Sequence, residues 1–393
     1  MKYGKLFTLV VAVSMIALIA VACATPAPVT VKETVVVPQT VAVPQTVVVP
    51  QTVVVQPPAP TQPPAPTAVK AVEGTLTSVM TKVVPVIDGN GTDAAWVNAP
   101  ASEIAVRTFG TPAFKITLKS LYDAENLYLL VSYPDSNMDV DRSEWAFDPA
   151  KKVWARIEDD FGDEDEFGFF WNINMPDFPK TGCLTTCHGE TMVSKKGERV
   201  DDWRWNSSRS NPMGWARDFY LSDDEKADPY GGFSKDDGYK TNAGYKDNTQ
   251  EINKAQVPLY WKPFSGTGGV VAGDPRYLLQ SEIDAKLAKK IVKVETDGTL
   301  VDEDNTKVPL WAHIPGRILS APAGPSWNNI KAKGAWLNGV WTVEFARKLQ
   351  TGFADDAQFE VGKEHYFDMY IKTRQPGEKA HAQVLLTKFV FAK

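Results

Sequence analysis

Two cysteines and a histidine near the middle of the chain form the pattern with the clearest chemical meaning. Cys183, Cys187 and His188 follow the order Cys-x-x-x-Cys-His. In haem c attachment, two thiols form thioethers to the vinyl groups and the adjacent imidazole ligates the iron. The spacing here is one residue longer than the usual Cys-x-x-Cys-His, so the pattern is less specific than the standard one.

The same residues have two other interpretations. Cys183 and Cys187 could form a disulfide in an oxidising compartment, or they could join His188 in a zinc site. A zinc site needs a fourth ligand, and no cysteine follows Cys187 in the sequence. The three residues alone leave haem, disulfide and zinc open, and the rest of the chain favours haem.

The first residues have the composition of a secretory signal. Lys2 and Lys5 precede an apolar run over residues 6–21, and small residues lead into Cys23. This predicts a signal peptide over residues 1–22 with Cys23 as a lipidated first residue, as in bacterial lipoproteins. The alternative is a plain transmembrane anchor, for which the apolar run is short. Either tether predicts a location on the extracytoplasmic face of the cell membrane.

Residues 23–73 are of low complexity. A six-residue repeat of the type Thr-Val-Val-Val-Pro-Gln starts at Thr34, Thr40 and Thr46, and a proline-rich stretch follows. Repeated prolines favour extended chain over ladder pairing, so we expect a stalk. Loss of the signal would move the formal charge from −6 to −8, because it removes two lysines and no acids. An acidic body argues against nucleic acid as a partner.

The remaining residues, 74–393, suffice for one large domain with a sizeable core. Short runs with alternating apolar residues are typical of an all-β antiparallel sandwich with loop insertions and one or a few short helices. The runs are residues 114–122, 127–133, 166–173, 341–345, 365–371 and 383–391. The helical pattern covers residues 278–294, where Ile283, Leu287 and Ile291 are spaced by four. For residues 222–256 the sequence predicts a long loop segment with little regular structure.

Several stretches together resemble a known family. Residues 85–96 resemble the opening strand and turn of a sandwich that carbohydrate-binding modules share with the haem-binding γ subunits of ethylbenzene dehydrogenase-type molybdenum enzymes. Residues 202–218 resemble the Trp-x-Trp stretch of that haem-binding branch, and residues 314–319, 339–349 and 380–383 also fit. The resemblance spans nearly all of the body.

The resemblance implies one haem at the end of the sandwich and a role in electron transfer. In b-type members a methionine before the Trp-x-Trp stretch and a lysine near the C-terminus hold the iron. The first position falls within the motif of Cys183 and Cys187, and the second falls near His381. We therefore expect His188 and His381 as iron ligands. The alternatives for the second ligand are Met192, Met213, Met369 and His365.

Other residues have weaker assignments. The resemblance suggests Trp205, with Trp203 and Trp215, at the haem edge, although tryptophans in β-rich cores commonly just fill volume. It also suggests Arg209 for a haem propionate, since a guanidinium fork suits a carboxylate; a surface salt bridge is the alternative. His313 and His365 read as structural residues.

Residues 158–166 hold seven carboxylates in nine positions. Such a density could bind Ca²⁺ through oxygen ligands, but a solvated acidic loop or a docking patch for a basic partner is the simpler interpretation. The sequence contains no Ser/His/Asp set, phosphate loop or paired catalytic carboxylates at convincing spacing. We therefore expect an electron-transfer protein or subunit rather than an enzyme by itself.

The sequence thus predicts an exported, lipid-anchored c-type cytochrome with one covalent haem. Its partner would be a redox protein, such as the molybdenum and iron–sulfur subunits of an oxidoreductase. The competing hypothesis is a surface-tethered carbohydrate- or solute-binding sandwich in which Cys183 and Cys187 form a disulfide.

Overall fold

The structure is a computed structural model. It describes residues 74–108, 111–140, 142–157, 164–182, 193–224, 233–235, 244–263, 277–322, 324–375 and 378–392. The chain divides into two units after Pro63, and every described residue belongs to the second, Pro64–Lys393. The predicted signal, Cys23 and the whole of the predicted stalk precede the described ranges. Within these ranges no helix has the length and apolarity that a bilayer crossing requires.

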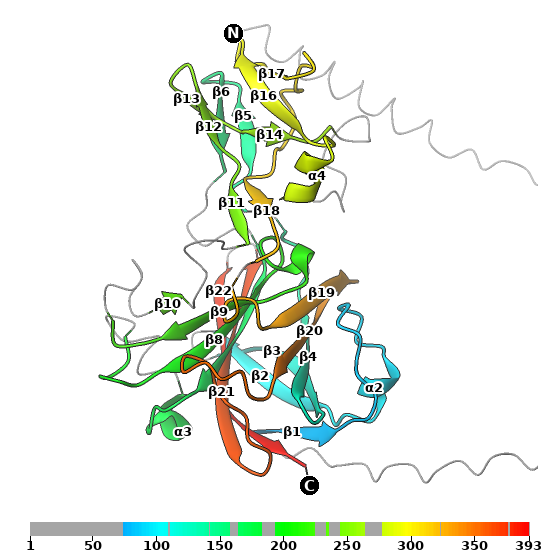
Figure 1. Ribbon diagram of the computed structural model, residues 1–393, viewed down its shortest axis with the longest axis vertical. Coiled ribbons are helices and arrows are strands. Elements are labelled where there is room, and N and C mark those ends of the chain that lie inside the picture. Colours follow the sequence, from blue (N-terminus) through cyan, green and yellow to red (C-terminus); the bar gives the residue numbers. More distant parts are fainter. Residues whose placement is uncertain are drawn as a thin grey trace, which may run out of the picture. The chain divides into compact units, whose positions relative to one another are not determined.

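The described part of the chain is mostly β-structure with short helices (Figure 1). The helices are α2 (Ala94–Val97), α3 (Phe178–Thr181), α4 (Gln280–Asp284) and the 3₁₀ helix η2 (Asn211–Met213). The strands are β1 (Thr75–Met80), β2 (Ser102–Thr108), β3 (Thr111–Tyr122), β4 (Asn126–Pro134), β5 (Trp145–Asp148), β6 (Val153–Arg156), β7 (Glu166–Asn172), β8 (Val200–Asn206), β9 (Arg217–Leu221), β10 (Phe233–Lys235), β11 (Tyr245–Asp247), β12 (Gln250–Ile252), β13 (Ala255–Val257), β14 (Tyr260–Trp261), β15 (Leu278–Leu279), β16 (Lys289–Val294), β17 (Leu300–Asp302), β18 (Arg317–Leu319), β19 (Lys331–Leu337), β20 (Val340–Lys348), β21 (Glu364–Gln375) and β22 (Glu378–Phe391).

The all-β prediction is confirmed. Five of the six alternating runs lie within the strands β3, β4, β20, β21 and β22, and the sixth, residues 166–173, covers β7 and one residue beyond it. Within residues 222–256, the described strands β10, β11 and β12 have three residues each, in keeping with the expected lack of long regular elements.

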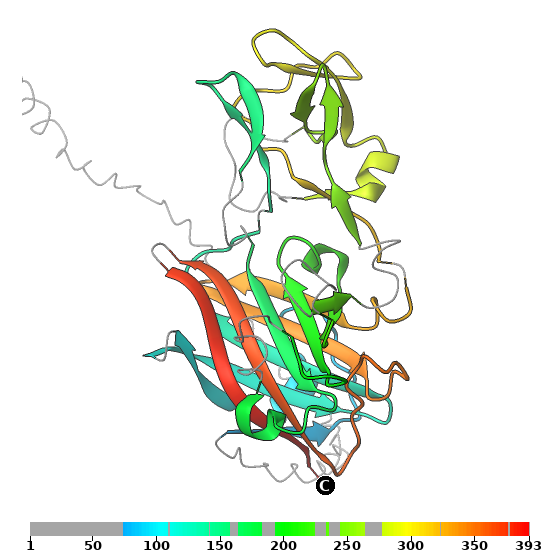
Figure 2. The same ribbon diagram turned by 90° about the vertical axis from the view of Figure 1, so that its left-hand side faces the viewer.

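One 12-stranded sheet forms the frame. Its order is β10-β9-β8-β7-β21-β22-β1-β3-β4-β20-β19, and β2 pairs with β3 and β22. The strand β1 runs parallel to both β22 and β3, whereas the other ladders of this sheet are antiparallel. Figure 2 shows the strands β7, β8, β21 and β22 as one layer with β19 and β20 behind them. The sheet therefore folds over on itself as a two-layer sandwich.

The main core fills the space between the two layers. In β7 the alternate residues Phe167, Phe169 and Trp171 are at most 1% exposed. The Phe169 ring centroid lies 5.3 Å from that of Phe345 on β20 and 6.1 Å from that of Trp203 on β8. Because side chains alternate across a strand, the remaining residues of β7 point to the other face of the sheet.

A second apolar cluster belongs to the segments inserted between β4 and β7 and between β10 and β19. It includes Trp145 and Trp154 from the hairpin β5–β6, with Trp261 and Ile291 from β14 and β16. The indole Nε1 of Trp145 donates to the carbonyl of Asn248 at 2.8 Å. These small sheets are the loop insertions that the sequence predicts.

The helix predicted over residues 278–294 is wrong for most of its length. Only Gln280–Asp284 is helical, and Lys286 has φ of 59°, which ends the helix. Residues Lys289–Val294 form β16, which pairs with β14 and β17. Ile291 is buried and Val292 is 51% exposed, so strand alternation and sheet pairing override the four-residue spacing.

The strand expected within residues 85–96 is also wrong. The opening strand is β1, and this segment is a loop that ends in α2. The buried carboxylate of Glu344 on β20 explains the difference: it accepts hydrogen bonds from the backbone of Gly89 at 2.7 Å and from Nε1 of Trp96 at 2.7 Å. The backbone donors of the loop are thus satisfied by a side chain instead of a ladder.

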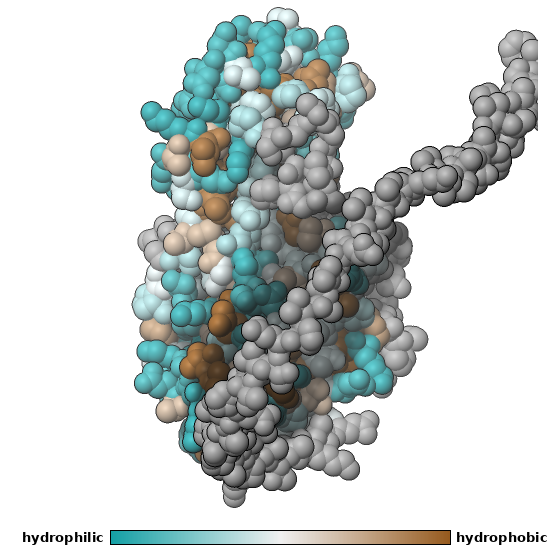
Figure 3. Space-filling model, turned by 90° about the vertical axis from the view of Figure 1, so that its right-hand side faces the viewer, coloured by the Kyte–Doolittle hydropathy of each residue, from teal (hydrophilic) through white to brown (hydrophobic). Residues whose placement is uncertain are grey.

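Apolar side chains on the face shown in Figure 3 are scattered among hydrophilic ones wherever the surface is not drawn in grey. The exposed apolar residues include Val97 and Leu337, which are 73% and 71% exposed. Single exposed apolar side chains are ordinary at a protein surface, so this face indicates no docking surface by itself.

Candidate functional site

The predicted cofactor motif begins directly after α3. This helix ends at Thr181, and the next residue, Gly182, has φ of 57°. A Cβ atom at that position would lie 2.2 Å from Oδ2 of Asp368 on β21. Glycine is therefore required where the chain passes this carboxylate. Cys183, Cys187, His188 and Met192 lie outside the described residues, and the described chain resumes at Val193.

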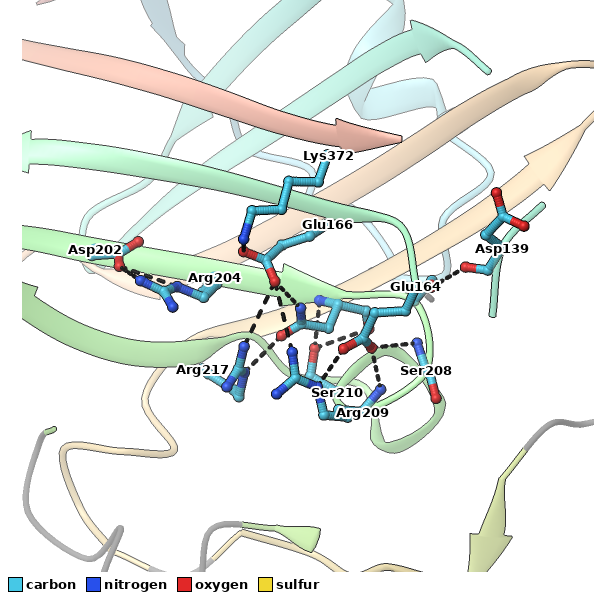
Figure 4. A network of polar contacts seen from close by, with 12 residues as sticks. Asp139, Glu164, Glu166, Asp202, Arg204, Ser208, Arg209, Ser210, Arg217 and Lys372 are labelled. Carbon is cyan, nitrogen blue, oxygen red and sulfur yellow. Dashed lines mark hydrogen bonds and ion pairs between the residues drawn. The ribbon is translucent and has the colours of Figure 1, made fainter. Parts of the chain in front are cut away.

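Charged side chains gather on strands β7, β8, β9 and β21 and on the turns beside them (Figure 4). On β7, Glu166 lies on the face opposite to Phe167 and the main core. We call this group the charged network; it consists of Glu164, Glu166, Asp202, Arg204, Asn206, Arg209, Arg217 and Lys372. Its carboxylates are all buried.

Glu166 is the centre of the charged network. Its carboxylate lies 3.3 Å from Nζ of Lys372, 3.7 Å from a guanidinium nitrogen of Arg209 and 3.8 Å from one of Arg217, and Asn206 Nδ2 donates to it. Burial alone would raise the pKa of this carboxyl group. The surrounding cations, Lys372 first, outweigh burial and hold the pKa of Glu166 well below its usual range.

Arg209 is paired within the network through Glu164. The Glu164 carboxylate accepts from the Arg209 side chain and from the backbone N–H groups of Ser208 and Arg209 at 3.2 and 3.0 Å. The Arg209 side chain is only 12% exposed. Arg209 therefore does form a salt bridge, but a buried one and not one at the surface. A propionate role for Arg209 would have to coexist with this pair, and it stays a prediction.

A small residue opens space beside Arg204. Gly168 on β7 lies under the ring of Tyr370, and a Cβ there would be 2.1 Å from a ring carbon. The Arg204 guanidinium lies 4.5 Å from the ring centroid of Phe219 and 5.9 Å from that of Tyr370, and it pairs with Asp202. Gly168 thus lets aromatic rings and cations share one side of the sheet.

The charged network has one more cation than carboxylates. Arg204, Arg209, Arg217 and Lys372 face three carboxylates. The three arginines are at most 19% exposed and Lys372 is 39% exposed, and a partly buried excess of cations is complementary to an anionic group. The two propionates of a haem would be such groups, so the described charges fit a haem held from the motif that starts after Gly182.

The register places His381 near the same network. His381 on β22 pairs with Lys372 of β21. Lys372 is four residues from Asp368 on β21, which corresponds to about 13 Å along the strand. His188 lies six residues after Gly182, and a chain of that length spans at most about 20 Å. The tether is therefore long enough for His188 and His381 to act on one iron. The side chain of His381 is not among those described, and its ligand role stays a prediction.

The other sequence-predicted residues occupy different places. Trp205 is buried in the main core, with Nε1 donating to Asn211 Oδ1 at 3.1 Å. Met369 is also in that core, and Met213 packs beside Trp215. The His365 ring lies 5.3 Å from that of Phe359, which is a structural contact. The roles of these residues toward a haem stay predictions.

A second group of carboxylates lies one residue away from Glu166. Asp165 Oδ2 accepts from Nε1 of Trp341 at 2.8 Å and from the backbone of Asp139 at 2.9 Å. Burial and then the charge of Asp135 raise the pKa of Asp165 to about 9, and burial raises the pKa of Asp135 to about 6. We call Asp135 and Asp165 the acidic pair. The raised pKa values of both carboxyl groups favour a proton held by the pair.

The acidic run over residues 158–166 is described only from Glu164 onward. Its last three residues, Glu164, Asp165 and Glu166, are at most 6% exposed, so a solvated loop is the wrong interpretation for them. Within the described ranges, no group of three or more histidines, cysteines and acids is arranged to hold a metal ion. Ca²⁺ binding by the rest of the run stays a prediction.

Sequence reasoning missed most of the charged network. Glu166, Arg217 and Lys372 carry no motif, and each stands next to apolar residues in a strand. The only available signal was a charge at an alternate position of an aromatic strand, which predicts solvent exposure as readily as a buried ion pair. The acidic pair had no signal of its own.

Comparison with known families decides the relationship. The family model described as ethylbenzene dehydrogenase matches residues 92–370, more than half of the chain. The chain belongs to the ethylbenzene dehydrogenase family. The matched range contains the motif of Cys183, Cys187 and His188 and most of the charged network, but it ends before His381. No curated protein sequence matches the chain.

Solved structures similar to this member of the ethylbenzene dehydrogenase family include carbohydrate-binding proteins. A family 9 carbohydrate-binding module from Caldicellulosiruptor kristjanssonii, in complex with glucose, is 11% identical with a TM-score of 0.32, covering 80% of this chain and 94% of that one. A putative carbohydrate-binding protein from Bacteroides uniformis is 7% identical with a TM-score of 0.31, covering 81% and 98%.

Proposed function

We propose that this chain is an exported, lipid-anchored c-type cytochrome that transfers single electrons. It would serve as the haem subunit or redox partner of a molybdenum-type oxidoreductase. The observation that carries the proposal is the Cys183-x-x-x-Cys187-His188 motif inside a member of the ethylbenzene dehydrogenase family. The haem would supply a one-electron Fe(III)/Fe(II) couple.

The protein side chains would have three tasks. Cys183 and Cys187 would fix the haem covalently, and His188 and His381 would ligate the iron as two nitrogen donors. Arg209, together with the other cations of the charged network, would balance the propionates. The carboxylates already present in that network keep the cations ordered, because each of Arg204, Arg209, Arg217 and Lys372 has a carboxylate within 4 Å.

The first test is a pyridine haemochrome spectrum of purified protein and of the Cys183→Ala/Cys187→Ala variant. The wild type should show the thioether-type band and keep its haem through acid–acetone extraction, and the variant should lose covalent haem. Circular dichroism should remain that of a β-protein in both, since the main core is formed by apolar residues outside the cysteine motif. A wild type without haem and with a Cys183–Cys187 disulfide would replace the cytochrome by the solute-binding hypothesis.

The second test separates the iron ligands. His381→Ala should convert a low-spin six-coordinate spectrum into a high-spin one, whereas the matched control His365→Ala should leave it unchanged. An unaltered low-spin spectrum in His381→Ala would reject this ligand and favour a methionine.

The anchor needs its own test. Cys23→Ala should release the protein from the membrane fraction without any change in its visible spectrum. If the variant still sediments with membranes after a high-salt wash, a transmembrane anchor replaces the lipid.

A further inference from the structure

Four arginines from separate segments lie close enough for the charges of three of them to act on the fourth, Arg317. We call Arg142, Arg156, Arg209 and Arg317 the arginine cluster. Arg142 precedes β5, Arg156 ends β6, Arg209 follows β8 and Arg317 begins β18. The ring centroid of Tyr245 lies 5.6 Å from the guanidinium carbon of Arg209 and 5.8 Å from that of Arg317.

Two carboxylates of the described residues lie beside these arginines. Asp247 forms an ion pair with Arg317 and lies 3.6 Å from Arg156, and Glu164 holds Arg209. The side chains of Arg156 and Arg317 are each 16% exposed. Among the described residues, two carboxylates thus lie beside these guanidinium groups, and those of Arg156 and Arg317 are largely buried, where water screens their charges poorly.

Two hydrogen-bond donors of the cluster are buried and make no hydrogen bond to the described residues. Within the part of the chain that the structure describes, the buried Nε atoms of Arg142 and Arg317 have no hydrogen-bond partner. Among the described contacts, Arg142 has neither an ion pair nor a hydrogen bond. A buried guanidinium nitrogen without an acceptor is unfavourable in a folded protein, so such a group usually indicates a missing partner.

Burial and the other arginines of the cluster lower the pKa of Arg317. Burial lowers the pKa of this guanidinium to about 10, and the charges of Arg209, Arg156 and Arg142 act in the same direction. A bound anion would reverse the electrostatic part of this effect.

We propose that the arginine cluster binds an oxyanion group, a carboxylate or a phosphate, with Arg142 and Arg317 as the principal donors. The planar fork of a guanidinium donates two parallel hydrogen bonds to such a group. The group could belong to a free small molecule or to a haem propionate that extends past Arg209. The proposal does not depend on haem attachment, because the open donors belong to residues outside the cysteine motif.

The test is isothermal titration of the full chain with inorganic phosphate and with succinate. Wild-type protein and the haem-free Cys183→Ala/Cys187→Ala variant are compared, each with and without Arg142→Gln. Arg142→Gln should weaken binding at least tenfold. The matched control Arg199→Gln removes the same charge outside the cluster and should bind as its parent does.

The two sources of the oxyanion give different results. Binding to both parents identifies a free small molecule as the occupant. Binding to the haem-free variant alone identifies a haem propionate, since the attached haem then fills the cluster. If neither parent binds either probe, or if Arg199→Gln weakens binding as much as Arg142→Gln, the proposal is rejected.

Thermal unfolding separates a binding role from a structural one. Without anion, Arg142→Gln should unfold at the same temperature as its parent or higher, because it removes a repelled and unpaired charge. The rise in unfolding temperature that phosphate or succinate causes in the parent should disappear. A lower unfolding temperature together with an intact anion-dependent rise would show a structural role instead and overturn the proposal.

Discussion

Asp165 and Glu166 are consecutive residues that lie in regions of opposite electrostatics. Both are buried, at 0% and 4% exposure. Glu166 lies among the cations of the charged network, and its pKa is well below the usual range. Asp165 belongs to the acidic pair, and its pKa rises to about 9. Burial acts in the same direction on both groups, so the neighbouring charges decide the sign.

The comparison shows how one strand can separate two kinds of chemistry. Residues that alternate along β7 meet different neighbours, because successive side chains point to opposite faces of the sheet. Glu166 meets Lys372 from β21 and Arg217 from β9, while Asp165, just before the strand, meets Trp341 from β20. The charged network could bind an anion, and the acidic pair could hold a proton.

The largest expected effect is that of Glu166→Gln. It removes the anion shared by the buried cations of the charged network and should lower the free energy of unfolding by about 3–5 kcal/mol. Urea denaturation at pH 7 measures this change. The control Glu103→Gln, in an exposed pair with Lys115, should change it by less than about 1 kcal/mol. A loss at Glu166 as small as the control's would show that the network contributes little to stability.

Glu166→Gln should also change how the free energy of unfolding depends on pH. The pKa of Glu166 is lower in the folded chain than its ordinary value of 4.5. Its contribution to stability is therefore complete above about pH 4.5 and is lost as the pH falls through the folded pKa. Unfolding curves between pH 3 and 6 should show a smaller loss on acidification in Glu166→Gln than in the wild type. Parallel losses would contradict the lowered pKa.

Asp165→Asn should change the stability in the opposite direction to Glu166→Gln. Since its pKa rises from 3.8 to about 9 on folding, the wild type loses stability as the pH increases between these values. An amide cannot ionise, and it can donate a hydrogen bond to Asp135. The variant should be more stable by roughly 1–3 kcal/mol at pH 7, with a flatter pH profile between pH 5 and 8. Destabilisation at every pH would mean that Asp165 is ionised and stabilised in the folded protein.

Gly168→Ala tests the close approach of the Tyr370 ring to strand β7 beside Arg204. The new methyl group would collide with the ring of Tyr370, and overpacking of this kind should cost about 2 kcal/mol. Chemical denaturation gives the loss, and the double variant Gly168→Ala/Tyr370→Leu should recover part of it relative to Tyr370→Leu alone. Additive losses would show that the ring does not set the limit at Gly168.

The smallest effect is expected for Trp341→Phe. It removes the hydrogen bond from Nε1 to Asp165 and should cost about 1 kcal/mol. Because this bond favours the ionised carboxyl group, its loss should raise the pKa of Asp165 further. Carbon-detected NMR titration of the Asp165 carboxyl group measures the shift. A lower pKa in the variant would contradict the assigned contact.

Local patterns predicted the strands well and the helix poorly. Alternation in residues 166–173 and 383–391 identifies β7 and β22, because a strand with one face in the core needs apolar residues at every second position. In residues 278–294 the spacing of Ile283, Leu287 and Ile291 indicated a helix. The chain instead turns at Lys286 and pairs Lys289–Val294 with β14 and β17, a long-range effect that spacing cannot report.

The sequence by itself was enough to predict the all-β class, the export signal, the stalk and the motif of Cys183, Cys187 and His188. Each of these depends on residues that are neighbours along the chain. Only the tertiary structure decided the neighbours of the buried charges. Glu166 and Lys372 are 206 positions apart and meet because β7 pairs with β21 in one register. The arginine cluster likewise combines four distant segments. Electrostatic interaction depends on distance in space, which the order of residues along the chain does not specify.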